Sequence, residues 1–419
     1  MKDRPKGLIS QYDDIWLLDG VRTPFADYNT VLGLVSPIDL GIKVAREVLH
    51  RSEVSPEQID AVIAGSMAQA SFDAYLLPRH IGTYSGIPIE VPAHLVQRVC
   101  GTGIEVILQA SDLIKLGKAE VVLGVGTESM SRNPIAAYTH RGGFRMGQVD
   151  FKDFLWEALL DPSCNLTMGE TAEALAKQYE VSRQDADEFA ADSFDKAVGA
   201  QQSCFLSGEI VAITTERFER EGYKPRGIRL PRGVDQFTQD SHIRPSPVEA
   251  LSKISPAFGG VQTGGNSSGI VDGAAATVIA SGKYARQHNK KALAKVVAGV
   301  AVGVSPEIMG IGPVTAIRRL LEVCGLALDQ IDRFEINEAF AAQTLACERD
   351  LDLDHKKLNV NGGAIAIGHP LAATGVRLAV TLARELQRSS MRYGIASACI
   401  GGGQGIALLV ENPGSNVSH

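Results

Sequence analysis

Apolar and polar positions follow two periods that alternate along this chain, and together they predict an α/β protein. Short apolar runs are typical of strands buried in a sheet, and they lie at 15–18, 59–67, 120–126, 271–279, 294–302 and 334–336. Apolar residues at helical spacing predict helices between them, at 37–49, 75–86, 104–116, 171–179, 313–324, from 338 onward and at 370–386. Because strands alternate with helices, the pattern predicts the α/β class, with 120–126 as a buried strand of the parallel kind.

Capping residues mark the ends of several of these helices. Ser36 is expected to cap the first helix, with Pro37 at its first position, and Ser182 is expected to cap another, with Asp185 three residues later. Gly325 is expected to end the helix over 313–324.

The hydrophobic pattern changes between residues 129 and 261. There, charged helices and a polar, proline-containing stretch replace the alternation of strands and helices. At 419 residues the chain also exceeds what one hydrophobic core usually supports. Two features recur in both halves: a Gln-Ile-Asp segment before a strand, at 58–60 and 330–332, and a cysteine in a glycine turn, at 100 and 399. We therefore predict a duplicated fold with one active site between its halves: residues 1–129 plus 262–286, an inserted loop region over 130–261, and residues 287–419.

Cys100 is the first candidate for chemistry. It lies in a glycine turn between an apolar segment and a predicted helix, where free N–H groups and the positive end of the helix dipole favour the nucleophilic thiolate. The alternative interpretation is that Cys100 is a small buried apolar residue, as most free cysteines are.

Three further stretches carry candidate residues. His369 precedes Pro370 at a predicted helix start, where the dipole would keep the imidazole neutral, although a histidine there is often a simple cap. Cys399 begins a glycine run between two strands, and the exposed N–H groups of such a turn, including that of Gly401, suit an oxyanion hole. Asn337 stands at a strand-to-helix junction, where it is either functional or an N-cap.

Composition narrows the class of protein. The net charge of -7 provides no electrostatic footprint for nucleic acid. The six cysteines are scattered and the histidines form no ligand pattern, so neither a disulfide framework nor a metal site is expected. The first 14 residues lack an apolar segment typical of a signal peptide, and no apolar run reaches the roughly 18 residues of a membrane span. We expect a soluble cytoplasmic protein.

Four motifs, in order, closely resemble the signatures of the thiolases. They are Val-Cys-Gly-Thr-Gly at 99–103, Asn-Glu-Ala-Phe-Ala at 337–341, Gly-Gly-Ala-Ile-Ala-Ile-Gly-His-Pro at 362–370 and Cys-Ile-Gly-Gly-Gly at 399–403. The resemblance runs from the Arg-Thr-Pro-Phe segment at 22–25 through the Gly-Gly-Asn-Ser-Ser-Gly segment at 264–269 to the last strand. It implies two similar α/β halves in a five-layered α-β-α-β-α sandwich, a loop domain inserted in the first half, and assembly into homodimers or homotetramers.

The resemblance also implies a reaction, the reversible cleavage of a 3-oxoacyl-CoA by coenzyme A into an acyl-CoA and acetyl-CoA. Cys100 would carry the acyl group, His369 would deprotonate it, and Cys399 would be the second acid/base. One oxyanion hole would use His369 and a water held by Asn337, and the other would use the backbone N–H groups of Cys100 and Gly401. Coenzyme A would be a substrate, with no tightly bound cofactor.

The family pattern further assigns substrate contacts and exposes three departures. Arg244, Ser268 and Gly269 match positions that contact coenzyme A, and Met168 and Met309 match positions along the acyl pocket, although a methionine is often core filler and Arg244 could be a solvated charge. The departures from the family pattern are Ala372 for a glycine, Thr167 for a frequent histidine and Gln97 for a usual asparagine. Alanine at 372 is strained if φ there is positive and favourable if the backbone is helical.

Two other functions fit the resemblance less well. A ketoacyl synthase relative would share the fold and the cysteine, but it would have histidine in place of Asn337 and no thiol like Cys399. A non-catalytic acyl-CoA-binding protein on the same fold would not need Cys100, His369 and Cys399 together.

Overall fold

The computed structural model describes residues 6–67, 74–137 and 140–414. Its centre is a twisted ten-stranded sheet, counted within those residues, with the path β16-β17-β18-β15-β1-β14-β5-β3-β4 and the short β2 beside β14. The strands from the first half are β1 (Leu8–Arg22), β2 (Ala26–Asp27), β3 (Ala61–Gly65), β4 (Ala93–Val96), β5 (Val121–Glu128) and β14 (Val271–Ser281). Those from the second half are β15 (Ala294–Gly303), β16 (Arg333–Ile336), β17 (Tyr393–Ile400) and β18 (Gln404–Glu411).

The strand order is repeated in the two halves. Outward from the antiparallel β1–β15 pair, one side reads β1, β14, β5, β3, β4 and the other reads β15, β18, β17, β16, followed by a parallel bridge between Phe334 and Leu358. The recurring Gln-Ile-Asp segments also match, because the short 3₁₀ helices η1 (Pro56–Gln58) and η8 (Leu328–Gln330) precede the equivalent strands β3 and β16. The predicted duplication is therefore present in the fold.

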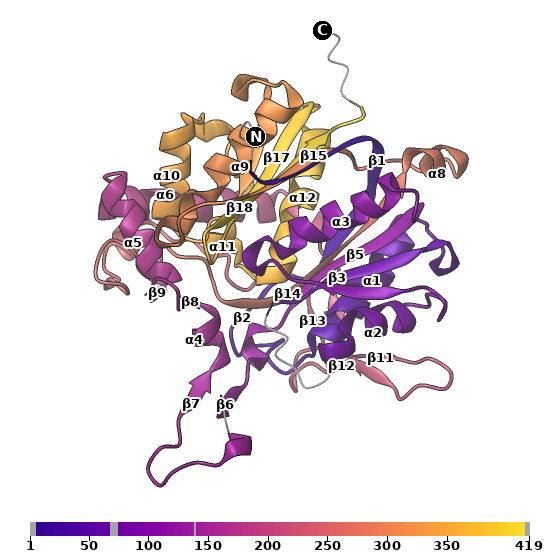
Figure 1. Ribbon diagram of the computed structural model, residues 1–419, viewed down its shortest axis with the longest axis horizontal. Coiled ribbons are helices and arrows are strands. Elements are labelled where there is room, and N and C mark those ends of the chain that lie inside the picture. Colours follow the sequence, from indigo (N-terminus) through magenta and orange to yellow (C-terminus); the bar gives the residue numbers. More distant parts are fainter. Residues whose placement is uncertain (1–5, 68–73, 138–139, 415–419) are drawn as a thin grey trace.

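Helices cover and separate the two parts of the sheet (Figure 1). In the first half these are α1 (Pro37–Arg51), α2 (Leu77–Tyr84), α3 (Thr102–Lys115) and α8 (Gly282–Gln287), and in the second α9 (Gly312–Cys324), α10 (Ala341–Leu351), α11 (Ala364–Ile367) and α12 (Leu371–Arg388). Helix α1 packs on β14 and β5, helix α9 packs on β18 and β15, and α3 and α12 pack on each other and on strands of both halves. This arrangement gives the α-β-α-β-α layers that the resemblance implies.

The two central helices approach each other through glycines. A Cβ on Gly103 of α3 would lie 2.5 Å from the backbone nitrogen of Val376, and one on Gly375 of α12 would lie 2.3 Å from that of Ile104. Gly126 of β5 is equally close to the carbonyl oxygen of Ala372. A side chain at any of these positions would push the start of α12 away from α3, so these glycines fix where the two helix N-termini meet.

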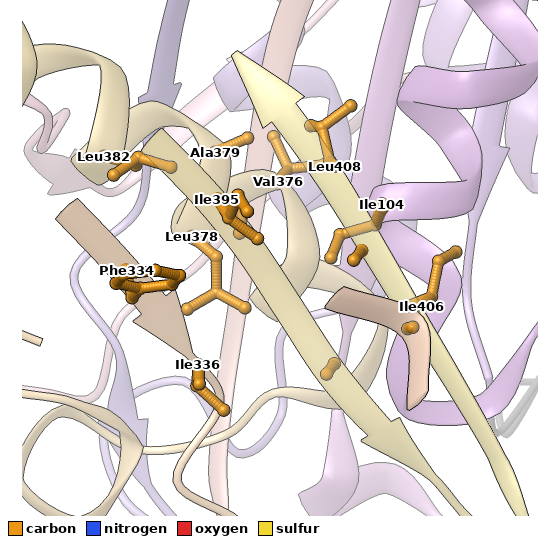
Figure 2. Packing of buried hydrophobic residues seen from close by; sticks show 14 of the residues in the cluster. Ile104, Phe334, Ile336, Val376, Leu378, Ala379, Leu382, Ile395, Ile406 and Leu408 are labelled. Atoms are coloured by element: carbon orange, nitrogen blue, oxygen red, sulfur yellow. The ribbon is translucent and has the colours of Figure 1, made fainter. Parts of the chain in front are cut away.

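Apolar side chains of α12 anchor it to the second-half strands. Figure 2 shows Val376, Leu378 and Leu382 of α12 packed among Phe334, Ile395 and Leu408, all fully or almost fully buried. Leu378 and Leu382 are one helical turn apart, whereas Val376 lies on another face of a helix that is buried along nearly its whole length.

The region between β5 and β14 contains small elements and two long helices. They are β6 (Ile135–Ala137), β7 (Phe151–Asp153), α4 (Phe154–Ala158), β8 (Leu160–Asp161), β9 (Leu166–Thr167), α5 (Met168–Gln178), α6 (Arg183–Gln202), β10 (Ile213–Thr214), β11 (Glu216–Phe218), β12 (Arg226–Ile228), β13 (Gln236–Phe237) and α7 (Val248–Leu251). Helices α5 and α6 pack against α10, whereas the β6–β7 arm extends away from the body (Figure 1). The predicted capping of α6 is confirmed, since Ser182 accepts from the Asp185 N–H.

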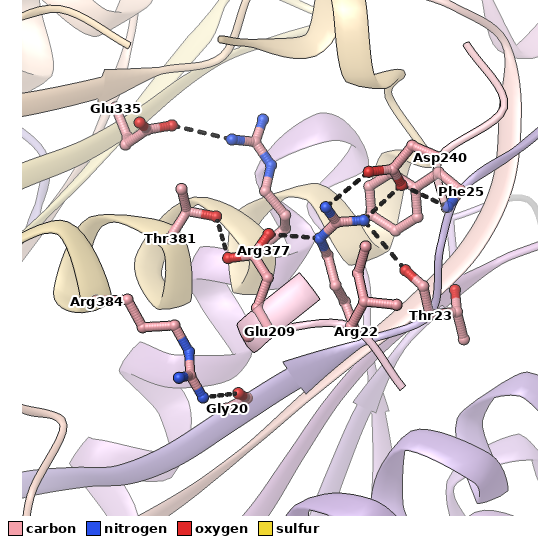
Figure 3. A network of polar contacts seen from close by, with 12 residues as sticks. Gly20, Arg22, Thr23, Phe25, Glu209, Asp240, Glu335, Arg377, Thr381 and Arg384 are labelled. Atoms are coloured by element: carbon pink, nitrogen blue, oxygen red, sulfur yellow. Dashed lines mark hydrogen bonds and ion pairs between the residues drawn. The ribbon is translucent and has the colours of Figure 1, made fainter. Parts of the chain in front are cut away.

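A buried arginine ties this region to the first half (Figure 3). Arg22, at the end of β1, donates from Nε to Glu209 at 2.6 Å and from both terminal nitrogens to Asp240 at 2.6 and 2.9 Å. All three charges are almost fully buried, so loss of one partner would leave an uncompensated charge in the interior.

Four predicted boundaries were wrong, and one of them is the start of α5, which lies at Met168 rather than Thr171. Strand β1 begins at Leu8 rather than near residue 15, because pairing with β15 extends it through polar residues. The helix expected from Glu338 begins at Ala341, since the buried Glu338 carboxylate instead accepts from Ser193, Asn359 and the Ile365 N–H. Helix α12 begins at Leu371, which makes Pro370 its N-cap residue.

The predictions for Ser36 as a cap, Pro37 after it and Gly325 as a left-handed helix terminus are confirmed. Within the described residues, none of the helices has both the length and the apolar character needed to cross a membrane.

Candidate active site

Cys100 lies in a short 3₁₀ turn, η3 (Val99–Gly101), between β4 and α3. The preceding residue, Val99, has a φ of 44°, a left-handed conformation that is costly for a β-branched side chain. The Thr102 hydroxyl holds the turn, because it donates to the Val99 carbonyl at 2.6 Å and accepts from the Arg98 N–H at 2.9 Å. The strained turn places the Cys100 side chain at the N-terminus of α3, as the sequence predicted.

The surroundings of Cys100 differ from the expected thiolate-favouring site. Burial raises the pKa of its thiol to about 11, with the Glu128 charge acting in the same direction, while the backbone N–H groups of Gly401 and of Cys100 itself donate toward the sulfur and lower it. Desolvation therefore outweighs the helix N-terminus, and the resting group is a neutral thiol. The same two N–H groups are those that the family resemblance assigns to an oxyanion hole, where they would bind the thioester oxygen rather than the sulfur.

His369 is held by hydrogen bonds at both ring nitrogens. Its Nδ1 lies 2.6 Å from Thr374 Oγ1, and its Nε2 lies 3.3 Å from Asn337 Nδ2. Because an amide nitrogen donates, the network assigns the ring hydrogen to Nδ1 and the lone pair to Nε2. Burial, reinforced by the Arg377 charge, lowers the pKa of His369 to about 3, so the ring is neutral, as predicted, although burial is the larger cause rather than a helix dipole.

Asn337 follows β16, and its backbone N–H donates to the Ser397 carbonyl at 2.9 Å, which fixes it beside β17. The side chain is fully buried, and its Oδ1 has no hydrogen-bond partner among the described residues. Asn337 caps no helix, because α10 starts four residues later. A buried amide with a free oxygen beside His369 is more consistent with a ligand-directed role than with a cap.

Cys399 lies near the end of β17, fully buried against Met309 and Ala339. Burial raises the pKa of its thiol well above the usual range, and a charge on Cys100 would raise it further. The turn η3 that holds Cys100 packs against β17, so the cysteine-containing turns of the two halves lie side by side.

A cavity of about 400 Å³ leads to this site. Its walls are mainly apolar, and they include His369 together with Met168, Ser268 and Gly269 from the predicted substrate contacts. Cys100 packs against Met130 and Leu371, which line the same cavity.

Two of the predicted contacts lie outside the cavity lining. Met309 is buried against Cys399, where it packs in the core beneath the acyl site. Arg244 is exposed, with its guanidinium 5.3 Å from the centre of the Phe194 ring and Nη1 donating to the His242 carbonyl at 2.9 Å. Arg244 is thus braced near the rim rather than free in solvent.

Two residues of the site were missed from the sequence. Thr374 appeared only as part of a motif, and its spacing of five residues from His369 was the available signal. His242 also lines the cavity, with Nδ1 2.6 Å from Asp27 Oδ1. A single histidine in a polar loop gives no pattern that could have identified it.

The structure explains two of the three departures from the family pattern. Ala372 lies in the first turn of α12 without positive φ, and its N–H donates to Glu128 at 3.1 Å, so alanine is favourable there. Thr167 caps α5 through a capping box with Glu170. Gln97 is exposed, and nothing in the structure explains its substitution.

Comparison with known proteins agrees with this geometry. Residues 15–283 match the N-terminal domain of thiolases, and residues 290–412 match the C-terminal domain. The chain belongs to the thiolase family. A mitochondrial 3-ketoacyl-CoA thiolase of Pongo abelii is 41% identical over 402 residues, covering 95% of this chain and 98% of the relative. A β-ketoadipyl-CoA thiolase of Acinetobacter baylyi is 40% identical over 408 residues, covering 94% and 98%.

Solved structures show the same thiolase fold. The crystal structure of human mitochondrial 3-ketoacyl-CoA thiolase in complex with CoA has a TM-score of 0.89 and 40% identity, and covers 95% of this chain and 98% of the other. The resemblance inferred from four motifs is therefore confirmed over nearly the whole length.

Proposed function

We propose that this thiolase-family protein is an acetyl-CoA C-acyltransferase, which cleaves a 3-oxoacyl-CoA with coenzyme A and catalyses the reverse Claisen condensation. The observation that carries the proposal is that the turn with Cys100 packs against β17, which carries Cys399 and leads to Gly401, beside a cavity lined by His369. A nucleophile, an oxyanion site and an acid/base are the parts that transfer of an acyl group from carbon to sulfur needs.

In the cleavage direction, the Cys100 sulfur attacks the 3-oxo carbonyl carbon while Nε2 of His369 accepts the thiol proton. The resulting oxyanion collapses, the bond between C2 and C3 breaks, and the acyl group remains on Cys100. The acetyl-CoA enolate leaves and takes a proton from Cys399. Both groups at the start are neutral, so the transfer from thiol to imidazole is driven by the bound substrate rather than by a resting ion pair.

In the second half-reaction, coenzyme A replaces the enzyme as the thiol. The coenzyme A sulfur attacks the acyl carbon on Cys100 while its thiol proton passes to the Cys399 thiolate. Protonated His369 then returns its proton to the leaving Cys100 sulfur, so His369 and both cysteines regain their starting protonation. The N–H groups of Cys100 and Gly401 would stabilise the oxyanion at the acyl-cysteine carbonyl. Protonated His369, with a water on Asn337, would stabilise the oxyanion of the other thioester.

Coenzyme A would reach Cys100 through the cavity beside Ser268 and Gly269, with its nucleotide near Arg244. No tightly bound cofactor is needed for these steps. Homodimeric or homotetrameric assembly and a cytoplasmic location stay predictions, and the 3-ketoacyl-CoA thiolase relative is named as mitochondrial. The division into 1–129 plus 262–286, 130–261 and 287–419 is likewise proposed, with the middle segment as the platform for coenzyme A and the acyl chain.

The test is thiolysis of acetoacetyl-CoA and a longer 3-oxoacyl-CoA, with Cys100→Ala and Cys399→Ser beside the parent. We expect activity from the parent, none from Cys100→Ala, and labelling of Cys100 by radioactive acetyl-CoA in Cys399→Ser despite its loss of condensation. Absence of turnover at every chain length would refute the proposal. Decarboxylation of a malonyl thioester would indicate a ketoacyl synthase, and binding without labelling would indicate a scaffold.

A further inference from the structure

His242 is a polar group in the wall of a cavity that is otherwise mainly apolar. It lies after β13, packs 6.1 Å from the Phe194 ring and has a side chain only 14% exposed. Its Nδ1 is 2.6 Å from Asp27 Oδ1, and no hydrogen bond reaches Nε2 from the described residues. The steps of the proposed reaction use neither His242 nor Asp27.

Asp27 holds His242 in one orientation. Asp27 Oδ2 accepts from the Ser241 hydroxyl at 3.1 Å, and the Asp27 backbone N–H donates to the Ser241 hydroxyl oxygen at 2.8 Å. The hydrogen bond with His242 lowers the pKa of Asp27, so this carboxylate is ionised and can only accept. In the neutral ring the hydrogen is therefore on Nδ1, and Nε2 carries a lone pair.

The ring is also fixed relative to the catalytic end of the cavity. A Cβ on Gly269 would lie 3.0 Å from both Cδ2 and Nε2 of His242, so the ring lies directly on this glycine. The Gly269 carbonyl accepts from the His369 backbone N–H at 2.9 Å. Strand β2 pairs with β14 at Asp27 and Val271, which ties the carboxylate to the same stretch of backbone.

Three other polar side chains of the wall are committed to the protein, whereas a fourth, Ser268, is already a predicted coenzyme A contact. Ser267 donates to the Thr263 carbonyl at 2.7 Å, Thr263 Oγ1 accepts from two backbone N–H groups, and Thr167 caps α5. A substrate amide that enters this cavity loses its water and needs a partner there. His242 lines this cavity, and its oriented Nε2 is an acceptor that such an amide could use.

We propose that His242, oriented by Asp27, is a substrate-binding residue that accepts a hydrogen bond from an amide N–H in the pantetheine arm of the CoA thioester. The inference rests on the proposed function, and it adds a contact that positions the thioester between the rim at Arg244 and the catalytic groups. The carboxylate makes the contact directional, because in the neutral ring it places the hydrogen on Nδ1 and leaves Nε2 as the acceptor.

The test pairs variants with altered substrates. Acetoacetyl-pantetheine and two analogues, each with one amide N–H replaced by an ester oxygen, are assayed with the parent, His242→Leu and His242→Gln. We expect the parent to use one ester analogue about 3- to 10-fold less efficiently than the amide, as the loss of one neutral hydrogen bond predicts. His242→Leu should use the amide substrate and that ester analogue with equal efficiency, and its KM should be raised while its kcat is nearly unchanged. His242→Gln should recover part of the parent's preference for the amide.

Several results would overturn the inference. One is a parent that uses both ester analogues as efficiently as the amide. Another is a His242→Leu protein that still prefers the amide as the parent does, and a third is a His242→Leu protein in which only kcat falls. His288→Leu, on the exposed end of α8, is the matched control and should behave as the parent does. If His242→Leu does not fold, the graded response of His242→Gln decides. A parent inactive on every 3-oxoacyl thioester refutes the proposed function itself and is thereby distinguished from failure of the His242 contact.

Discussion

Nδ1 of His369 lies 2.6 Å from the hydroxyl oxygen of Thr374, which is in the first turns of the helix that His369 precedes. The hydroxyl in turn faces the Pro370 carbonyl at 3.4 Å, so it accepts from the ring and donates to the backbone. This arrangement orients the imidazole and keeps the lone pair on Nε2, which faces Asn337 Nδ2.

Thr374→Val should reduce kcat for acetoacetyl-CoA thiolysis about 10- to 100-fold, because the buried Nδ1–H loses its acceptor and the ring its fixed tautomer. The free energy of unfolding should fall by about 1–3 kcal/mol, because the same Nδ1–H is left without an acceptor in the interior. Thr374→Ser retains the hydroxyl and should be close to the parent in both measurements. Parental kcat in the valine variant would contradict the assigned role.

Cys100 should react slowly with iodoacetamide at neutral pH in the absence of substrate. With a pKa near 11, only about 10⁻⁴ of the thiol is ionised at pH 7, so the alkylation rate should rise about tenfold per pH unit up to pH 10. Peptide mapping by mass spectrometry separates Cys100 from the exposed Cys204, which is an internal control. If the alkylation rate of Cys100 reached a plateau below pH 8, the resting group would be a stabilised thiolate and not a neutral thiol.

Ala372→Gly, which restores the common family residue, should lower the free energy of unfolding by about 0.5–1 kcal/mol. The reason is the greater freedom of glycine in the unfolded chain at a helical position without positive φ. Urea unfolding measures the change, and kcat should stay within about twofold because the N–H bond to Glu128 survives. A stabilised glycine variant would mean that alanine is strained there.

His355 should make stability depend on pH between neutral and alkaline conditions. Hydrogen bonds to Asp192 and Glu348, at 3.0 and 2.9 Å, raise the pKa of His355 to about 9, although burial and Lys196 oppose the shift. Because the folded pKa lies above the unfolded value near 6.5, the contribution is complete below pH 6.5 and is lost as pH rises through 9.

Urea unfolding of the parent and His355→Gln at pH 6, 7.5 and 9.5 checks this dependence. The parent should lose its advantage over the variant by pH 9.5, and the effect should be modest since the imidazole is 40% exposed and partly screened. A constant difference across the three pH values would assign the effect to packing instead.

Much of this site was readable from the sequence because its chemistry is concentrated in short glycine turns. Cys100, His369 and Cys399 each stand next to residues that a reactive group needs, so the motifs identify them without knowledge of the fold. The thiol pKa was not predictable, since the helix N-terminus is visible in the sequence but the depth of burial around Cys100 is a property of the packed chain.

The missed features depend on contacts between distant segments. The first part of β1 is polar, with Ser10, Gln11 and Asp13, and it becomes a strand only because β15 pairs with it. Glu338 fits a helix by propensity, yet three partners from elsewhere in the chain bind its carboxylate. His242 acquires a partner 215 residues away. None of these interactions leaves a local pattern.

The central pairing of β1 with β15 has a meaning beyond the stability of the sheet. These are equivalent strands of the two repeats, and they run antiparallel, which is the relationship between one surface and its own copy across a two-fold axis. A one-repeat ancestor could have formed this contact as a symmetric dimer. The two repeats are not equivalent in sequence, since one carries Cys100 and the other carries His369 and Cys399.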